Sequence, residues 1–514
     1  MSPETQNDEV QVQEEGLLDR ILNKIEKIGN RLPHPIILFF ILAGLVLVVS
    51  WLVSLFDVAV QHPGTGETIE AVNLLSRYGI RRIFSEAVDN FTQFAPLGVV
   101  LVAMLGVGVA DKSGLIIAVL KKLVMGAPER YITAVLVFAG IMSNLALDAG
   151  YVVLVPLGAI IFSSIGRHPL VGLAAAFAGV SGGFSANLLL SALDPMLMEL
   201  SLEAASLIDP EYFAPATANW YFLIVSTFLV TIVGTWVTEK IVAPRFGEYT
   251  GDYTEEMDEV TERESKAMKS ALIALLVFIA IILVMTVPSD GILRDDQGNL
   301  VTAMTPFVDG MVPLIALFFF IPGLAYGIKA GSIESSDDVA EYLSETMADM
   351  GGYVALAFAA AQFVEYFAWS NLGTILAIAG ADFLEAVGFT GLPLIILFII
   401  VASFINIFVG SASAKWAIMA PVFVPMLMQL GYAPEFAQMA YRIGDSVTNI
   451  ITPLMPYFAI IIAFAKKWDE KVGIGTIIST MIPYSVAFLI GWTILLIIWF
   501  VFGLPLGPGG AMFY

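Results

Sequence analysis

The stretch 410–445 places charged and aromatic side chains among apolar surroundings, where they could bind a solute. It carries Lys415, Trp416, Arg442 and Asp445 between two long apolar runs. Charges inside or beside bilayer spans are costly and usually serve a pathway or a site. The stretch opens with Gly-Ser-Ala-Ser, small residues that can break a helix and free backbone groups, which only protein or a water-filled cavity can satisfy at membrane depth. We interpret this stretch as half of a solute site.

Arg442 offers a guanidinium fork that can grip a carboxylate or sulfonyl group at two points. The alternative is structural: an ion pair with Asp445, three residues along the same helix face, or an anchor at the cytoplasmic surface. Asp445 and Asp194 are candidates for ion coupling, because a carboxylate within the membrane can coordinate Na⁺ or carry a proton. For Asp194, which precedes Pro195 at the end of a span, the alternative is helix capping or solvation in a loop.

Trp416 presents a large flat face on which an aromatic ring can stack. A tryptophan near the end of a span is more often part of the interfacial aromatic belt, but the neighbouring break at 411–413 favours a role in the site. Lys415 is left open, since its ammonium could extend to the interface or face the site.

The composition indicates a polytopic membrane protein. Of its 514 residues 58% are hydrophobic and 14% charged, whereas soluble domains carry about 25% charged residues. Residues 1–32 are polar and acidic and lack the apolar core of a signal peptide. The net charge of −22 is concentrated in tails and loops such as 4–15 and 248–264. This acidic coat disfavours nucleic-acid binding, which needs a basic surface to neutralise phosphates.

Several kinds of chemistry are disfavoured by what the sequence omits. The absence of cysteine removes disulfides, thiolate nucleophiles and metal–thiolate sites. Only three histidines occur, so a histidine metal site or a Ser–His catalytic pair is not expected. No G-x-x-x-x-G-K-[ST] phosphate loop is present, so direct ATP drive by this chain is not supported. We expect no cofactor beyond a coupling cation, Na⁺ or H⁺.

The apolar runs are long enough to cross a bilayer at about 20 residues per helix. They lie at 35–56, 95–120, 170–200, 218–238, 270–288, 307–328, 392–430, 446–465 and 482–503. The run 392–430 is nearly twice the required length, and its small residues from Gly410 to Ser413 divide it. A basic interfacial helix is predicted at 16–31, and an N-terminus in the cytosol also places most basic span ends there. These ends carry Lys121, Lys122, Arg130, Arg167, Lys240, Arg245, Lys466 and Lys467.

Two further apolar segments, 131–163 and 350–387, are interrupted midway by a polar tip. Their arms of about 13 to 17 residues are shorter than a full span, as in re-entrant hairpins. The tips contain Ser143, Asn144 and Asp148 in the first segment and Ser370, Asn371 and Gly373 in the second. Tip oxygens suit hard cations, which predicts Na⁺ near Asn144 and Asn371. The alternatives are ordinary turn formation and, for Asp148, capping of the second arm.

The hairpins and breaks recur at one spacing. Ser-Asn-Leu triplets begin at Ser143 and Ser370, positions that differ by 227, and the same offset carries Gly183 to Gly410. Duplication of a hairpin and a broken helix is typical of secondary transporters whose site lies between repeats. Whether the repeats are inverted stays open.

The repeat predicts a domain organisation of two halves with flanking segments. These are a cytoplasmic tail at 1–34, a first half at 35–243 with a broken helix at 170–200, a charged loop at 244–268, a second half at 269–465 with a broken helix at 392–430, and a last span with the C-terminus at 466–514.

At these motifs the chain resembles the p-aminobenzoyl-glutamate transporter (AbgT) family over nearly its whole length, from Gly29 to Tyr457. The most specific stretches are GNRLPHP, SNLALDAGYVVLVPL (143–157), GRHPLVGLAAAFAGVSGGFSANLL (166–189), ANWYFLIVSTF (218–228) and AQFVEYFAWSNLGT (361–374). The resemblance implies an all-α inner-membrane protein of about nine transmembrane helices and two re-entrant hairpins. It also implies a homodimer in contact with membrane lipids, and cation-coupled transport by alternating access.

The family's substrate-site pattern matches residue by residue. It implies substrate-binding roles for Asp194, Ser413, Trp416, Pro434, Arg442 and Asp445. The expected substrate is p-aminobenzoyl-glutamate or a related aromatic carboxylate, or a sulfonamide antimetabolite if the protein is an exporter. A dicarboxylate transporter is disfavoured by Trp416, and an intramembrane hydrolase by the missing catalytic groups. A passive channel would show flux unaffected by collapse of the ion gradient.

Overall fold

The computed structural model describes residues 33–61, 68–146, 149–249, 251, 260–300, 305–455 and 457–514. The regular structure of these residues is helical, which confirms the predicted fold class, apart from one short hairpin of β1 (Ala59–Gln61) and β2 (Thr68–Glu70). The predicted interfacial helix at 16–31 and the hairpin-tip residue Asp148 lie outside the described residues.

Six helical stretches in the described ranges are long and apolar enough to cross a membrane. They are α2 (Pro35–Ser54), α3 with α4 (Arg77–Thr92 and Ala95–Lys112), α10 with α11 (Trp220–Val237 and Ala243–Phe246), α12 (Glu262–Thr286), α14 (Met311–Ala330) and α22 (Ile474–Phe502). Two bent helix pairs raise the number to eight if each is one span. The exact number of spans therefore stays a prediction.

Both bent pairs precede the tips of the predicted hairpins. α5 (Leu115–Met125) turns by 112° into the segment Glu129–Ser143, which contains α6 (Ile132–Ser143). α15 (Ser336–Asp349) turns by 43° into α16 (Gly351–Trp369). The second arms are α7 (Ala149–Ser164) and α17 (Leu372–Ala386).

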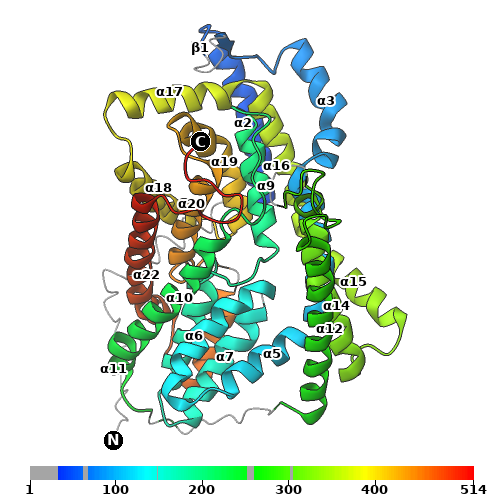
Figure 1. Cartoon of the computed structure of the whole chain (residues 1–514). Helices are drawn as coiled ribbons and strands as arrows, with labels where there is room; N and C mark the ends of the chain where they lie inside the picture. The colour runs from blue at the N-terminus through cyan, green and yellow to red at the C-terminus, as the bar shows by residue number, and fades with distance from the viewer. Residues whose placement is uncertain are drawn as a thin grey trace, which may run out of the picture.

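The two hairpins differ in length and in place. α16 has 19 residues, more than the arm length expected from the sequence, because its alanine-rich run favours an unbroken helix back to Gly351. Figure 1 shows α17 lying across the top of the molecule near β1, whereas α6 and α7 lie in its lower half. The tips of the hairpins thus lie at different levels.

Both long apolar runs with glycine breaks are interrupted helices. α8 (Pro169–Phe177) passes into a π-helical turn at Ala178–Gly182, and α9 (Leu193–Ala205) begins after an irregular stretch. α18 (Leu392–Asn406) ends before the second break, and α19 (Ala412–Gln429) follows it. α9 packs against α19, and α20 (Pro434–Asn449) packs against α18 and α19. The segments that follow the two breaks therefore meet in the core.

Glycines permit the close crossing of α6 over the π-helical turn. A Cβ on Gly140 would lie 2.8 Å from the backbone nitrogen of Val180 and 2.9 Å from Cα of Gly179. Small residues of this kind let helix backbones approach within membranes. The remaining α-helices among the described residues are the short α13 (Pro306–Asp309) and α21 (Phe458–Trp468). Part of the predicted loop 244–268 is helical, since Thr261 and Glu264 form a capping box that starts α12.

Candidate functional site

The first break is held to α20 by a buried ion pair. Arg442 Nη1 lies 2.7 Å from Asp194 Oδ1, and the side chains are 3% and 2% exposed. The other carboxylate oxygen, Asp194 Oδ2, accepts from the Ser191 backbone N–H at 2.6 Å and the Ser191 hydroxyl at 2.9 Å. Asp194 also lies in the first turn of α9, where a carboxylate complements the helix dipole. Arg442 is thus paired with Asp194 rather than with Asp445, the structural partner considered from the sequence.

A second buried ion pair anchors the second break. Lys415 Nζ contacts the carboxylate of Asp445 and the side-chain oxygen of Asn406, and all three residues are buried. Asn406 Nδ2 donates to the Asp445 carbonyl at 2.6 Å, Thr448 Oγ1 at 2.8 Å and Asn449 Oδ1 at 2.9 Å. Lys415 therefore faces the protein interior, which resolves the question that the sequence left open.

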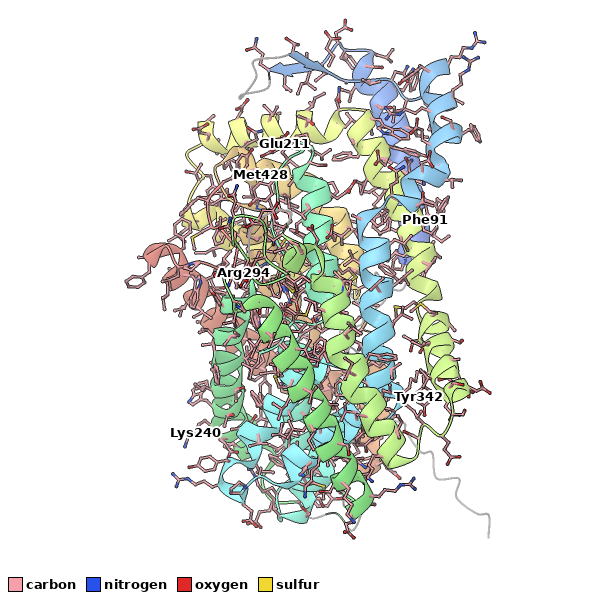
Figure 2. All side chains as sticks on the ribbon, turned by 45° about the vertical axis from the view of Figure 1, so that its right-hand side comes forward. Phe91, Glu211, Lys240, Arg294, Tyr342 and Met428 are labelled. Atoms are coloured by element: carbon pink, nitrogen blue, oxygen red, sulfur yellow. The ribbon has the colours of Figure 1, made fainter. Side chains whose placement is uncertain are left out.

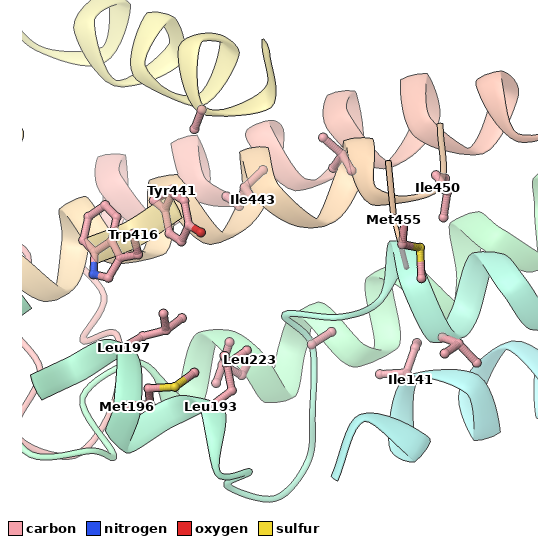
Figure 3. Packing of buried hydrophobic residues seen from close by; sticks show 14 of the residues in the cluster. Ile141, Leu193, Met196, Leu197, Leu223, Trp416, Tyr441, Ile443, Ile450 and Met455 are labelled. Atoms are coloured by element: carbon pink, nitrogen blue, oxygen red, sulfur yellow. The ribbon is translucent and has the colours of Figure 1, made fainter. Parts of the chain in front are cut away.

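Trp416 is enclosed by protein on the second half of the broken helix. Its ring stacks on Tyr441 with centroids 4.5 Å apart, and its Nε1 donates to Ser201 Oγ on α9 at 3.0 Å. Figure 3 shows both rings on one side of the packed core, opposite Leu197 and Met196 of α9. Trp416 is fully buried, so in this conformation it joins α19 to α20 and α9 and has no face open to a ligand.

Pro434 starts α20 and is likewise buried. The next residue, Glu435, accepts from Tyr212 Oη at 2.8 Å and from the Ala511 backbone N–H at 2.7 Å. Pro434 thus lies where α20 meets the C-terminal segment.

A cavity of about 340 Å³ lies at the second break. Its walls include Gly410–Ser413, Val100 and Met104 of α4, and Leu193 and Met196 of α9. A larger cavity of about 520 Å³ shares Gly410, Ser411, Ser413 and Tyr353 with it. Of the six residues matched to the family's substrate site, only Ser413 lines either cavity.

The smaller cavity combines an aromatic wall with a helix N-terminus. Tyr151 and Tyr457 both line it, and their rings stack at 4.7 Å with an interplanar angle of 6°. Ser411, which also lines the cavity, is the N-cap of the 18-residue α19, and its Oγ lies 3.4 Å from Ser413 Oγ. A helix N-terminus attracts anions through its free N–H groups and its dipole. The cavity can therefore hold a carboxylate and an aromatic ring together.

The hairpin tips do not meet at this cavity. Ser143 Oγ donates to the Gly140 carbonyl at 2.7 Å, and Asn144 Nδ2 donates to the Ile141 carbonyl at 3.1 Å. Asn144 is 3% exposed, and its Oδ1 has no hydrogen-bond partner among the described residues. This oxygen could serve a cation or a water.

The second tip is bound to the strand hairpin instead. Asn371 adopts a left-handed backbone with φ of 60°, and its Nδ2 donates to the Glu70 carbonyl at 2.8 Å. The Ser370 carbonyl accepts from the Val72 N–H at 3.0 Å. A Cβ on Gly373 would lie 2.9 Å from the Phe367 ring, so this glycine permits close packing of the two arms. These contacts are typical of a turn, and Na⁺ near Asn371 stays a prediction.

The sequence family model for the AbgT transporter family matches residues 20–514. The chain is a member of the AbgT family. The p-aminobenzoyl-glutamate transport protein of Escherichia coli K12 is 39% identical over 485 residues, 94% of this chain and 95% of that protein.

Two solved structures of AbgT relatives share the fold. The Alcanivorax borkumensis YdaH transporter has a TM-score of 0.88 and 46% identity and covers 93% of this chain and 100% of its own. Neisseria gonorrhoeae MtrF, whose structure is described as illuminating a class of antimetabolite efflux pumps, has a TM-score of 0.90 and 47% identity and covers 96% of this chain and 100% of its own. These matches confirm the family resemblance read from the motifs.

Several residues around the site escaped the sequence analysis. Asn406 is an amide within the apolar run, four residues before Gly410, and that contrast was a usable signal. Tyr151, Tyr457 and Ser191 carried no such signal, because tyrosine and serine are common at span ends and turns.

Proposed function

We propose that this AbgT-family protein is a secondary active transporter of p-aminobenzoyl-glutamate or a related aromatic amide-carboxylate. The observation that carries the proposal is the cavity at the second break, where the N-terminus of α19 and the Tyr151–Tyr457 stack share one space. The glutamate end of such a solute is anionic and its benzoyl end is flat and apolar, which matches these two walls. The E. coli relative named for this substrate supports the same assignment.

In this proposal the substrate contacts the break itself. Ser411 and Ser413 donate hydrogen bonds to the carboxylate beside the first N–H groups of α19, and the substrate ring packs against the Tyr151–Tyr457 stack. Arg442, Asp194, Trp416 and Pro434 act one layer behind, by holding α9, α19 and α20 together. The volume of about 340 Å³ is at the lower end of the about 300–1,000 Å³ usual for ligand pockets.

We propose that a coupling cation, Na⁺ or H⁺, acts at Asp445. Its carboxylate is buried, and Asn406, which donates to the Asp445 backbone carbonyl, also donates to the side chain of Asn449, which lines the cavity. A cation that neutralises Asp445 would compete with the Lys415 ammonium for the same oxygens. That competition would move the start of α19, where the substrate carboxylate binds, and so couple the two ligands. Asn144 Oδ1 is a second candidate for an ion ligand.

Further parts of the proposal concern assembly and place. We propose that the protein lies in an inner membrane in contact with lipid, because long helices such as α12 expose apolar side chains along much of their length. Membership of the AbgT family leads us to propose a homodimer as well. Light scattering of the detergent-solubilised protein tests the dimer. We also propose that transport leaves the solute chemically unchanged, so recovery of hydrolysed p-aminobenzoyl-glutamate after incubation with the protein would contradict it.

A second candidate function is export of sulfonamide antimetabolites. The 47% identity to MtrF over nearly the whole chain favours it. A sulfonamide drug also combines an aromatic ring with an anionic or polar group, so the same cavity would suit it. Cells that express the protein would then accumulate less labelled sulfonamide than cells with an empty vector.

The decisive experiment measures uptake of labelled p-aminobenzoyl-glutamate into proteoliposomes under separate Na⁺ and proton gradients. We expect uptake that requires one gradient and falls about tenfold in Ser413→Ala, the effect of losing one hydrogen bond to a charged group. Tyr221→Phe, on an exposed face of α10 away from both cavities, is the control. Unchanged uptake in Ser413→Ala would overturn the placement of the substrate. Absence of uptake together with reduced cellular sulfonamide would decide for the exporter.

A further inference from the structure

A groove on the side of the molecule is lined entirely by apolar residues and lies apart from the substrate cavity. It has a volume of about 280 Å³ and runs between α12, the first turns of α14 and the start of α10. Leu283 of α12, Leu314 and Phe318 of α14, Trp220 of α10 and Leu189 of the first break contribute to its walls. None of its residues lines either cavity at the second break.

The groove opens beside the exposed apolar face of a helix long enough to span the membrane. Along α12, Leu276, Val277, Ile281 and Val284 are 52% to 73% exposed, and such a dense apolar surface on a span is covered by lipid. A groove without polar groups in that setting cannot hold ordered water, which needs two or more polar partners. Its natural content is hydrocarbon.

The cationic side chain of Arg294 lies at the polar end of this groove. Arg294 donates from Nε to the Thr286 carbonyl at 2.6 Å and from Nη1 to the Gly298 carbonyl at 2.7 Å. Thr286 lies three residues, just under one turn, beyond Leu283. The neighbouring Leu293 carbonyl accepts from the N–H of Phe307, which lines the groove. Figure 2 shows Arg294 beyond the end of α12. Through its bond to Thr286, the Arg294 guanidinium lies about one helical turn from the apolar groove.

We propose that this groove binds one acyl chain of a phospholipid whose phosphate lies near Arg294. The volume suits part of a single chain rather than a whole drug-sized molecule. Exposed Asp290 and Asp309 flank the same loop, so a zwitterionic headgroup with an ammonium fits this end better than an anionic one. The class of ligand is therefore a phosphatidylethanolamine-type lipid.

The bound chain lies against the first break. Leu189 and Leu190 line the groove, and the next residue, Ser191, holds Asp194 through its N–H and hydroxyl. Trp220 Nε1 donates to the Leu188 carbonyl at 2.9 Å, which fixes the same loop from the other side. A lipid in the groove therefore supports the loop that positions the Asp194–Arg442 pair. This inference does not depend on which solute is transported.

Native mass spectrometry of the full-length protein, purified in mild detergent and exposed to phosphatidylethanolamine or phosphatidylglycerol, tests the proposal. We expect retained phosphatidylethanolamine to fall about tenfold in Leu314→Trp, because excluding about two methylenes from the groove removes that much binding. Leu317→Trp, on the 43% exposed face of the same helix, should retain lipid as the wild type does. Arg294→Gln should weaken retention of both lipids, because both carry the phosphate, whereas Asp290→Asn/Asp309→Asn should abolish the preference for phosphatidylethanolamine without loss of the folded protein.

Phe318→Ala is the control for misfolding. It alters the same groove but enlarges it, so this variant should retain the lipid. Equal retention by Leu314→Trp and wild type would overturn the proposal. It would also be overturned by crosslinking of cysteines placed at 314 between two copies of the chain, which would assign the groove to a subunit partner. The assay contains no substrate, so failure of lipid binding and failure of the proposed transport are separately detectable.

Discussion

Arg442 and Asp194 come from segments 248 residues apart and form one buried pair at 2.7 Å. The pair joins the middle of α20 to the first turn of α9. Breaking a buried pair by removing one partner costs about 3–5 kcal/mol, because the remaining charge is left uncompensated. At the junction of the two halves, each charge of the pair therefore depends on the other for its neutralisation.

Arg442→Met should lower the melting temperature markedly, and Asp194→Leu should do the same. The double variant Arg442→Met/Asp194→Leu should recover most of the lost stability, since no isolated charge remains. Thermal unfolding in detergent measures this. Additive losses in the double variant would show that the pair contributes little. Lys266→Met, which breaks an exposed pair with Glu262, is the control and should change stability by less than about 1 kcal/mol.

The effects on stability of substitutions at Lys415 and Asp445 should depend on each other more strongly than those at Arg442 and Asp194. Lys415→Met leaves the Asp445 carboxylate buried beside Asn406 and should reduce stability at neutral pH, whereas Lys415→Met/Asp445→Asn should restore it. If Asp445 carries the coupling cation, the double variant should be stable yet transport without dependence on the gradient. A stable double variant with fully coupled transport would assign coupling to another group.

Trp416→Phe tests whether the indole touches the substrate. Phenylalanine keeps an aromatic face toward Tyr441 but loses the hydrogen bond to Ser201 Oγ. We expect a stability loss of about 1 kcal/mol and an unchanged KM for p-aminobenzoyl-glutamate, because the ring has no face in either cavity. A KM that rises severalfold at unchanged stability would show that Trp416 binds substrate in another conformation.

Gly410→Ala tests the close packing of the second break. A Cβ at this position would lie 2.9 Å from the Leu454 carbonyl oxygen, so the break must shift, at a cost of about 1–3 kcal/mol. Transport should fall because Gly410 lines both cavities. Gly351→Ala is a matched control, since no atom lies within 4 Å of its added Cβ, and it should behave as wild type.

The sequence predicted the features that short segments form, but not the contacts between segments far apart in the chain. Apolar runs, glycine breaks and polar tips are local, so the all-helical membrane fold and the interrupted helices followed from them. The pairing of Arg442 could not follow, because helix spacing pointed to Asp445 while the observed partner comes from the other half of the chain. The second hairpin illustrates the same limit, since its tip sequence resembles the first but packs on β2.

The sequence by itself determined the family, the membrane fold, the places where helices break, and which polar residues lie within the membrane. It did so because hydrophobic length, helix-breaking residues and buried charge are properties of short segments. Only the tertiary structure decided which charges neutralise one another, that Trp416 is covered by Tyr441, and that the serines of the break face a cavity. The physical reason is that a buried charge or ring takes whichever partner the packing of α9, α18, α19 and α20 brings within contact distance, and that packing is a property of the whole chain.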